Sequence, residues 1–262
     1  LLKPDILHCW LDHSNMWGAI SGIVLDIPKI ILSTRNVNPT NFNQFNLIGI
    51  RETYRLLKNA HNVTITNNSN FGAIDYAKWL NIEPQKIKII YNGIPKENFK
   101  KLSLQRQKQL KNKLLINPKM KVLLGVFRFS EEKEPIDFLK VVKKLRDYRE
   151  DFITLVYGEG PLKDQMKEFV KKNNLTNYLN FMGTSDDIDQ VMSIADVLLL
   201  TSRYEGTPNV FIEAQIVGCP IVATKAGGAD ETLIKNKTGF LADIGDINKL
   251  AIYVNKIFEN KF

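Results

Sequence analysis

The sequence has few cysteines and no long uninterrupted hydrophobic run. Cys9 and Cys219 are the only cysteines among 262 residues, and both lie among apolar neighbours. This excludes a disulfide framework and a cysteine-based metal site, and it favours free thiols in a reducing compartment. The longest apolar region, residues 18–32, contains two charged residues and a proline, so it is too polar to cross a bilayer.

A signal peptide and an initiating methionine are also lacking. The chain begins with Leu1, and no charged segment followed by a short apolar one precedes the first predicted strand. We therefore expect the sequence to be an excerpt whose true N-terminus is missing. Sequence repeats, coiled-coil heptads and low-complexity tracts are likewise not seen.

What the sequence has in abundance is positive charge. The composition is 44% hydrophobic and 24% charged, which is typical of a folded protein and not of a disordered one. The formal net charge of +8 suggests anionic partners such as nucleotides, phosphorylated lipids, an acidic membrane surface or nucleic acid. Scattered lysines on a solvated surface explain the same charge equally well.

Strand-like and helix-like segments alternate along the chain with short loops between them. This rhythm predicts an α/β protein with mostly parallel sheets. In the first half we expect strands at 5–10, 28–33, 62–66 and 86–91 and helices at 15–25, 42–59 and 69–80. In the second half we expect strands at 121–127, 152–157, 178–182, 196–201, 220–224 and 239–242 and helices at 135–148, 161–173, 187–194 and after Pro208.

A polar stretch separates the two halves. It is rich in Lys, Gln and Asn, and the turn dipeptides Asn92-Gly93 and Asn117-Pro118 bound it. We predict one domain over residues 1–93, a linker over 94–118 that contains a helix at 104–115, and a second domain over 119–262. The length of the chain fits two compact domains.

The loops at the carboxyl ends of the strands are the expected ligand site, because open α/β sheets bind ligands there. In the second half these loops also collect glycines and charges. They are residues 128–134, 158–161, 183–187, 203–209 and 224–231.

The segment from Glu205 to Glu213, a loop followed by the start of a helix, gives the most specific indication of a ligand. Thr207 followed by Pro208 predicts a helix N-cap and first helical residue, which would leave backbone N–H groups available to an anion. Glu205 precedes this cap and Glu213 lies about one turn into the helix, where a carboxylate would face hydroxyl groups. A ligand that is part phosphate and part sugar fits this pattern.

Two cations follow the first strand of the second half. Arg128 and Lys133 can bracket a phosphate group, the first as a planar fork and the second as a point charge. Basic residues near an exposed loop are more often simply solvated. Neither an Asp-x-Asp motif nor a His/Cys cluster is present that would supply a metal site.

Taken together, these motifs resemble the donor-binding half of glycosyltransferase family four, the retaining enzymes also called glycosyl transferases group 1. The pieces in order are Arg128-x4-Lys133, Gly158-Glu159-Gly160-Pro161, Phe181-Met182-Gly183, Glu205-x7-Glu213, Gly227-Gly228 with Glu231, and Asn236-Lys237-Thr238-Gly239-Phe240. The first half matches more loosely, through Pro4-Asp5-Ile6-Leu7-His8 and Ile89-Ile90-Tyr91-Asn92-Gly93-Ile94. The resemblance implies the GT-B architecture of two Rossmann-like domains, here with an incomplete N-terminal acceptor-side domain.

The resemblance also implies residue roles. Arg128 and Lys133 would neutralise the diphosphate of a nucleotide-sugar donor, so that neither a metal ion nor another cofactor is expected. Glu205 would face the transferred sugar as a stabilising group, and Glu213 would bind the ribose hydroxyls. The sugar and phosphate oxygens would be held by the intervening segment, Gly206, Thr207, Pro208, Asn209 and Val210, through its backbone amides.

Some positions depart from the family pattern. Phe127 and Glu134 stand where the family has glycines, and Trp10 replaces a second histidine after His8. These departures put the acceptor side and the sugar preference in doubt. His8 is better explained as a packed core residue than as a catalyst, and His13 or Asp12 could contact the sugar.

The expected function is transfer of a sugar from a nucleotide-diphosphate donor, with uridine as the assumed base, to a glycan or lipid-linked acceptor in polysaccharide or cell-envelope synthesis. We expect a cytoplasmic location, with peripheral contact at the inner face of the membrane and no nucleic-acid partner. The alternative is a catalytically inactive nucleotide-sugar-binding protein of the same fold. A GT-B phosphorylase or epimerase and an RNA-binding protein remain open, although the latter lacks interleaved aromatic residues.

Overall fold

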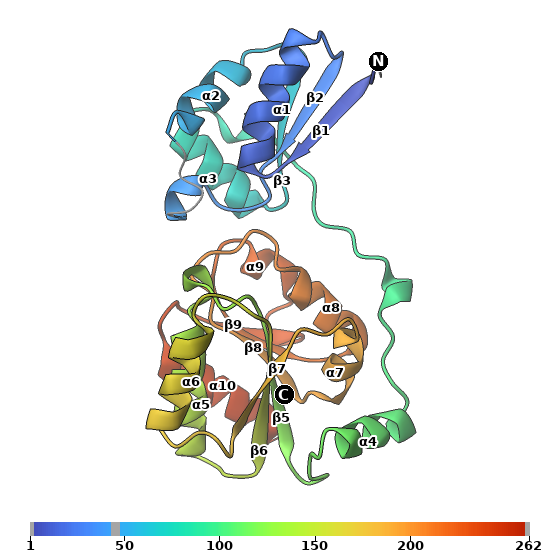
Figure 1. Cartoon of the computed structure of the whole chain (residues 1–262), viewed down its shortest axis with the longest axis vertical. Coiled ribbons are helices and arrows are strands. Elements are labelled where there is room, and N and C mark those ends of the chain that lie inside the picture. Colours follow the sequence, from blue (N-terminus) through green and yellow to red (C-terminus); the bar gives the residue numbers. More distant parts are fainter. Residues whose placement is uncertain (1–2, 43–47, 260–262) are drawn as a thin grey trace. The chain divides into compact units, whose positions relative to one another are not determined.

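The structure is a computed structural model that describes residues 3–42 and 48–259. The chain divides into two compact units, and each has its own parallel sheet (Figure 1). The first unit comprises Leu1–Gly93 together with Tyr204–Thr207, and the second comprises Ile94–Arg203 and Pro208–Phe262. The predicted fold class, α/β with two mostly parallel sheets of the GT-B type, is thereby confirmed.

The first unit is a four-stranded sheet of order β1-β2-β3-β4. All neighbouring strands are parallel, so helices must carry the chain back between them. The strands are β1 (Ile6–Trp10), β2 (Lys29–Ser33), β3 (Val63–Asn67) and β4 (Ile87–Ile89), and the helices are α1 (Asp12–Val24), α2 (Ile50–Leu57) and α3 (Asn70–Leu80).

Helices α1, α2 and α3 meet around one buried carboxylate. Asp12, in the first turn of α1, accepts hydrogen bonds at Oδ1 from the hydroxyls of Tyr54 on α2 and Tyr76 on α3, both at 2.8 Å. Both tyrosines are about 1% exposed or less, and Trp79 packs edge-on against both of their rings. Burial raises the pKa of the Asp12 carboxyl, although the two hydroxyls and the nearby His13 oppose the shift.

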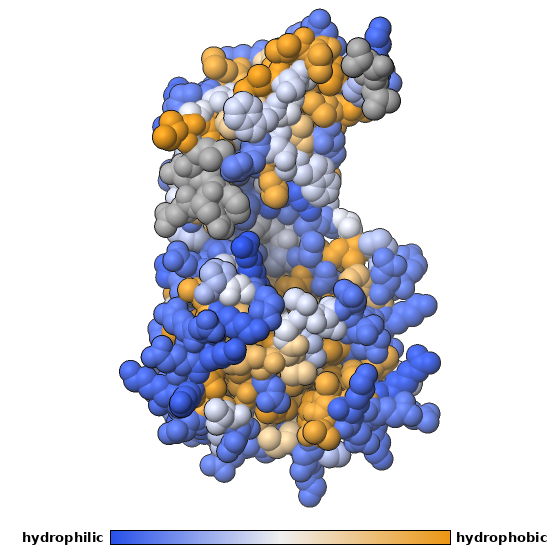
Figure 2. Space-filling model, viewed as in Figure 1, coloured by the Kyte–Doolittle hydropathy of each residue, from blue (hydrophilic) through white to orange (hydrophobic). Residues whose placement is uncertain are grey.

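Within the described part of the chain, helices cover one face of the first sheet and leave the other face without helices. Inward-facing strand residues such as Ile30 and Leu32 share one hydrophobic cluster with residues of all three helices, and Figure 1 shows these helices on one side of the sheet. On the edge strand β1, Ile6 and Trp10 are 54% and 49% exposed, and hydrophobic residues gather over β1 and α1 in Figure 2. A parallel sheet generally has both faces covered, so this face is unusual.

The second unit is a six-stranded sheet of order β10-β9-β8-β5-β6-β7. Its strands are β5 (Lys121–Val126), β6 (Phe152–Tyr157), β7 (Leu179–Gly183), β8 (Val197–Leu200), β9 (Ile221–Thr224) and β10 (Gly239–Ala242). Its helices are α4 (Leu104–Lys113), α5 (Pro135–Arg146), α6 (Lys163–Lys172), α7 (Ile188–Ile194), α8 (Asn209–Val217), α9 (Ala229–Thr232) and α10 (Ile247–Phe258).

Helices cover both faces of this second sheet. Successive side chains of a strand point to opposite faces, and Leu123 of β5 therefore joins a cluster with α5, α6 and α10. Its neighbours Val122 and Leu124 join a second cluster with α7 and α8, on which α4 packs. The apolar runs of these strands are buried on both sides, as parallel strands require.

The predicted elements are present, with two instructive differences. A helix was expected over 42–59, but Phe42 is extended and α2 begins only at Ile50, after Gly49 in the left-handed conformation; residues 43–47 lie outside the described part. Residues 94–118, expected as a linker with a helix at 104–115, contain α4 at Leu104–Lys113 and group with the second unit by their contacts. The apolar positions Leu110, Leu114 and Ile116 explain this, since they pack into its core.

Within residues 3–42 and 48–259, no helix is both long enough and apolar enough to cross a bilayer.

We predict that Asp12→Asn removes a pH-dependent loss in the free energy of unfolding of the first unit. A carboxyl whose pKa is raised on folding stabilises the folded state most when it is protonated. Its contribution therefore falls as the pH rises from the ordinary carboxyl pKa through the raised one, and it stays low above. The asparagine Oδ1 can still accept both tyrosine hydroxyls, so the variant should gain stability relative to the wild type over that interval.

The measurement is urea denaturation at several pH values, followed by tryptophan fluorescence. All three tryptophans, Trp10, Trp17 and Trp79, belong to the first unit, so the signal reports on it alone. Asp12→Leu is the contrasting variant, because it leaves two buried hydroxyls without their acceptor and should cost about 2 kcal/mol or more. A wild-type-minus-Asn difference that does not change with pH would contradict the prediction.

Candidate functional site

The carboxyl ends of β5 and β8 form the centre of the candidate site. These two strands are hydrogen-bonded neighbours, with Leu123 opposite Val197 and Leu124 opposite Leu198. The loop that carries Arg128 and Lys133 follows β5, and the loop that leads to α8 follows β8. Parallel pairing therefore brings the two loops to the same edge of the sheet.

Backbone hydrogen bonds to the neighbouring loop hold the segment around Arg128. The N–H of Phe127 donates to the carbonyl of Tyr157 at 3.1 Å, and the N–H of Phe129 donates to that of Glu159 at 2.9 Å. Both phenylalanine rings are buried, whereas the Arg128 side chain between them is exposed. The loop thus presents one guanidinium to solvent from a fixed backbone.

The glycines of the Gly158-Glu159-Gly160-Pro161 motif allow this close approach. A Cβ at Gly158 would lie 2.0 Å from the carbonyl oxygen of Phe127, and one at Gly160 would lie 2.4 Å from that of Phe129. Gly158 also has a φ of 138°, which L-residues rarely adopt. The motif therefore packs directly against the backbone on either side of Arg128 and fixes its position.

Phe127, which stands where the family has glycine, is accommodated by a glycine elsewhere. Its ring packs against Phe129 and Phe138, with centroids 5.7 and 5.1 Å apart. A Cβ at Gly125 would meet the Phe138 ring at 2.7 Å and the Phe127 ring at 2.9 Å. The bulk at position 127 is thus compensated within β5, and the Arg128 backbone is not displaced into the site.

The end of β8 braces the segment around Lys133. The buried Thr201 hydroxyl lies 3.0 Å from the carbonyl oxygen of Glu134 and 3.3 Å from that of Lys133. The N–H of Arg203 donates to the carbonyl of Glu132 at 2.8 Å, and its Nε donates to the Glu134 carboxylate at 2.5 Å. These contacts fix the position from which the half-buried Lys133 side chain extends.

The other departure from the family pattern, Glu134, has a backbone reason. Glu134 adopts φ 47° and ψ 56°, the left-handed conformation that glycine adopts without penalty, directly before α5 begins at Pro135. A glutamate there costs roughly 1 kcal/mol more than glycine. Its ion pair with Arg203 offsets part of this cost.

The helix that follows the second loop begins one residue later than predicted. Thr207 was expected as the N-cap and Pro208 as the first helical residue, but Pro208 is extended, with ψ 105°, and is itself the cap. It has no side chain that can accept a hydrogen bond, so the first amides of α8 have no side-chain cap. Asn209 and Val210 form the first turn of α8, directly after this cap.

Glu213 lies one turn into α8, as expected. It is half-buried, and burial raises the pKa of its carboxyl. A partly desolvated carboxylate gains more from hydrogen-bonding hydroxyl groups than one in bulk water does. The position suits an acceptor of hydroxyl hydrogen bonds.

The residues expected to form one site fall into both units. Arg128, Lys133, Pro208 to Val210 and Glu213 belong to the second unit, whereas Glu205, Gly206 and Thr207 group with the first. Glu205 is 7% exposed. Arg128, Lys133 and Glu213 therefore lie within one unit.

This edge of the second unit offers cations for an anionic ligand and the Glu213 carboxylate for hydroxyl groups. Among residues 3–42 and 48–259, no three His, Cys, Asp or Glu side chains gather into a group able to hold a metal ion. The residues that could bind an anion are Arg128 and Lys133.

Sequence reasoning missed the residues that brace this loop. Thr201 was read as the last residue of a strand and Arg203 as part of the following loop. Their partners, the carbonyls of 132–134, are some 70 residues away in sequence. The pairing of β5 with β8 brings them together, and no local pattern encodes it.

We predict that Thr201→Val destabilises the second unit by about 1 kcal/mol, because the hydrogen bond to the loop carbonyls is lost from a buried site. Thr154→Val in β6 is the matched control. Its hydroxyl is equally buried but has no hydrogen-bond partner, so valine should be neutral or stabilising there. Urea denaturation followed by far-UV circular dichroism measures both; equal losses in the two variants would contradict the prediction.

Comparison with known proteins gives the chain a family. The family model described as Glycosyl transferases group 1 matches residues 106–261. The Vi polysaccharide biosynthesis protein VipC/TviE of Salmonella typhi is 27% identical over 92% of this chain and 42% of its own length. The UDP-Gal:alpha-D-GlcNAc-diphosphoundecaprenol alpha-1,3-galactosyltransferase of Escherichia coli is 25% identical over 99% of this chain and 67% of its own length.

The fold is similar to that of solved structures as well. The crystal structure of Anabaena HepE in complex with UDP-glucose has a TM-score of 0.86 at 23% identity, covering 98% of this chain and 70% of HepE. The chain thus spans between about two fifths and two thirds of the length of these two curated relatives. By its match to the family model and by its two parallel α/β units, the chain belongs to the family of group 1 glycosyl transferases.

Proposed function

We propose that this protein transfers a sugar from a nucleotide-diphosphate donor to a glycan or lipid-linked acceptor. The observation that carries the proposal is the edge of the second sheet, where a braced loop carries Arg128 and Lys133 and the neighbouring loop leads into α8 and Glu213. Two cations and the N-terminal end of a helix suit a diphosphate, and a partly desolvated carboxylate suits a ribose. Family membership supports the same chemistry.

Arg128 and Lys133 would act on the leaving group. As the bond between the anomeric carbon and the phosphate oxygen breaks, negative charge grows on the diphosphate. Cations that are already in place stabilise this charge without reorganising. The proposal therefore assigns charge neutralisation to two side chains, with no requirement for a metal ion or other cofactor.

Glu205 and Glu213 would act on the two sugars of the donor. Glu213 would accept hydrogen bonds from the ribose hydroxyls, and Glu205 would stabilise the transferred sugar near its reacting carbon. The segment from Gly206 to Val210 would hold the remaining oxygens through its backbone N–H groups, which every residue of the segment except Pro208 has. We propose transfer with retention of the anomeric configuration, which NMR of the glycoside product tests directly.

The names of the relatives suggest the donor and the acceptor. The E. coli relative is named for UDP-Gal and for an acceptor on diphosphoundecaprenol, and the Salmonella relative for polysaccharide biosynthesis. We propose a uridine nucleotide as donor carrier and a lipid-linked glycan as acceptor. With such an acceptor, we further propose a cytoplasmic location with peripheral contact at the inner membrane face.

The second candidate is an inactive protein that binds nucleotide sugars without transferring them. Presence of the cations and both glutamates disfavours it, because a binder has no need to stabilise a leaving group. Release of free nucleotide in the presence of donor and acceptor distinguishes the two candidates.

We predict that UDP binds in the micromolar range in buffer containing EDTA, and that Arg128→Ala/Lys133→Ala weakens it about 100-fold or more. Each charge-assisted contact to phosphate contributes roughly tenfold or more. Isothermal titration of UDP, GDP and ADP measures the affinity and identifies the base.

The control is Lys143→Ala/Lys167→Ala, which removes the same charge from exposed positions on α5 and α6. It should bind like the wild type. Binding that needs added Mg²⁺ would refute the metal-independent mechanism, and absence of binding by the folded protein would refute the donor site.

We predict that Glu213→Gln weakens UDP about tenfold to 100-fold but leaves inorganic pyrophosphate unchanged, since pyrophosphate has no ribose. The ionised Glu213 carboxylate can accept one ribose hydroxyl at each of its two oxygens, whereas the protonated carboxyl uses one oxygen as a donor. The affinity of the wild type for UDP should therefore fall as the pH drops through the raised pKa of Glu213. The variant should lack this pH dependence. Equal losses for UDP and pyrophosphate would assign Glu213 a merely structural role.

A further inference from the structure

The net charge of the protein is concentrated in one segment. Residues 94–119, the basic segment, carry eight basic side chains and one acidic one, Glu97, which gives +7 of the formal +8 of the whole chain. The basic residues are Lys96, Lys100, Lys101, Arg106, Lys108, Lys111, Lys113 and Lys119. All but Lys111 are exposed, and within the described ranges none forms an ion pair.

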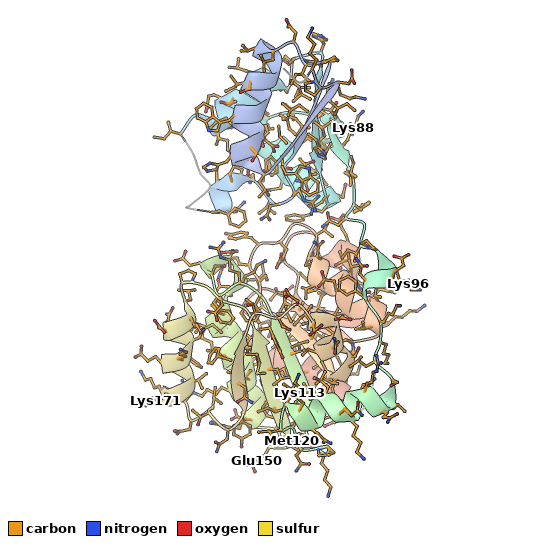
Figure 3. All side chains as sticks on the ribbon, turned by 45° about the vertical axis from the view of Figure 1, so that its right-hand side comes forward. Lys88, Lys96, Lys113, Met120, Glu150 and Lys171 are labelled. Atoms are coloured by element: carbon orange, nitrogen blue, oxygen red, sulfur yellow. The ribbon has the colours of Figure 1, made fainter. Side chains whose placement is uncertain are left out.

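The basic segment is anchored to the second unit by its apolar side. Leu110 and Leu114 of α4 pack with Ile116 into the core beside α7, and the N–H of Leu102 donates to the hydroxyl of Ser193 at 3.1 Å. The charges are thus held on a folded surface. Figure 3 shows Lys113 on α4 and Lys96 on the stretch before it, on the side of the unit opposite Lys171 of α6.

Two leucines project from this charged surface. Leu104, the first residue of α4, is 82% exposed, and Leu115, just past its end, is 93% exposed. Neither contributes to the core. Exposed leucines among lysines are typical of surfaces that insert apolar side chains between anionic headgroups.

Leu115 also has an unfavourable backbone conformation. The N–H of Leu115 donates to the carbonyl of Asn112 and that of Ile116 to the carbonyl of Lys111, the paired bonds of a Schellman motif. Leu115 therefore holds the left-handed position, with φ 56°, that glycine usually takes at this point. The motif requires the left-handed backbone but not a leucine, and the exposed side chain adds nothing to the core, which points to a role outside the fold.

We propose that the basic segment binds the surface of an anionic phospholipid bilayer, with its lysines on the headgroups and Leu104 and Leu115 inserted between them. Charge complementarity selects the partner, and the leucines favour a bilayer over nucleic acid. The one aromatic side chain of the segment, Phe99, is packed against the core, so none is offered for base stacking. The inference does not rest on sugar transfer, and its test needs neither donor nor acceptor.

The test is co-sedimentation of the full chain with vesicles of phosphatidylcholine alone or mixed with phosphatidylglycerol. Binding should require phosphatidylglycerol and weaken as salt is raised. Each basic side chain near the surface strengthens binding by roughly fivefold. The variant Lys100→Gln/Lys108→Gln/Lys113→Gln/Lys119→Gln should therefore bind about 100-fold more weakly or worse.

The charge-matched control changes four exposed lysines of α5 and α6, Lys143, Lys167, Lys171 and Lys172, to glutamine. It should lose far less binding, and equal losses would show that only net charge matters and overturn the proposal. Leu115→Gly relieves the backbone strain, so it should keep or raise the thermal midpoint while weakening vesicle binding about tenfold.

Two other results would overturn the proposal. One is absence of binding to phosphatidylglycerol vesicles by the folded wild-type chain. The other is preference for a single-stranded oligouridylate over these vesicles at the same salt concentration, which would make the basic segment a nucleic-acid surface.

Discussion

The candidate donor site depends on the hydrogen bonds that tie the end of β8 to the loop after β5. Thr201 and Arg203 hold the backbone of residues 132–134, and this backbone carries Lys133 and leads into α5. A cation that must stabilise charge on a leaving group is effective only if it is in place before the bond breaks. The bracing therefore links the order of the strands, in which β5 and β8 are neighbours, to the chemistry that we propose for their loops.

The glycines near the Arg128 loop and the residues that depart from the family pattern are also explained by the need to hold the backbone of this loop in place. The β6–α6 loop can approach Phe127 and Phe129 only because Gly158 and Gly160 have no side chains. Phe127 is tolerated because Gly125 leaves room for its ring. The close packing around this loop thus constrains the position of its backbone.

The sequence predicts the strands and most helices because their apolar periodicity matches their burial. The sequence predicts helix boundaries and domain membership less well, because contacts between distant residues determine them. The start of α2 depends on Gly49, and α4 looked like part of a linker because its few apolar residues, Leu110 and Leu114, are separated by charges. The network around Asp12 and the bracing by Thr201 join residues far apart in the chain, so no local pattern shows them.

Within the described residues, one face of the first sheet has no helices packed on it, and this feature bears on how the isolated polypeptide behaves in solution. An edge strand such as β1, with exposed Ile6 and Trp10, presents unpaired backbone groups beside apolar side chains. Such edges template pairing with another chain unless something covers them. Self-association of the isolated polypeptide should therefore grow with concentration, and a charged residue at Trp10 is the natural place to suppress it when the protein is prepared.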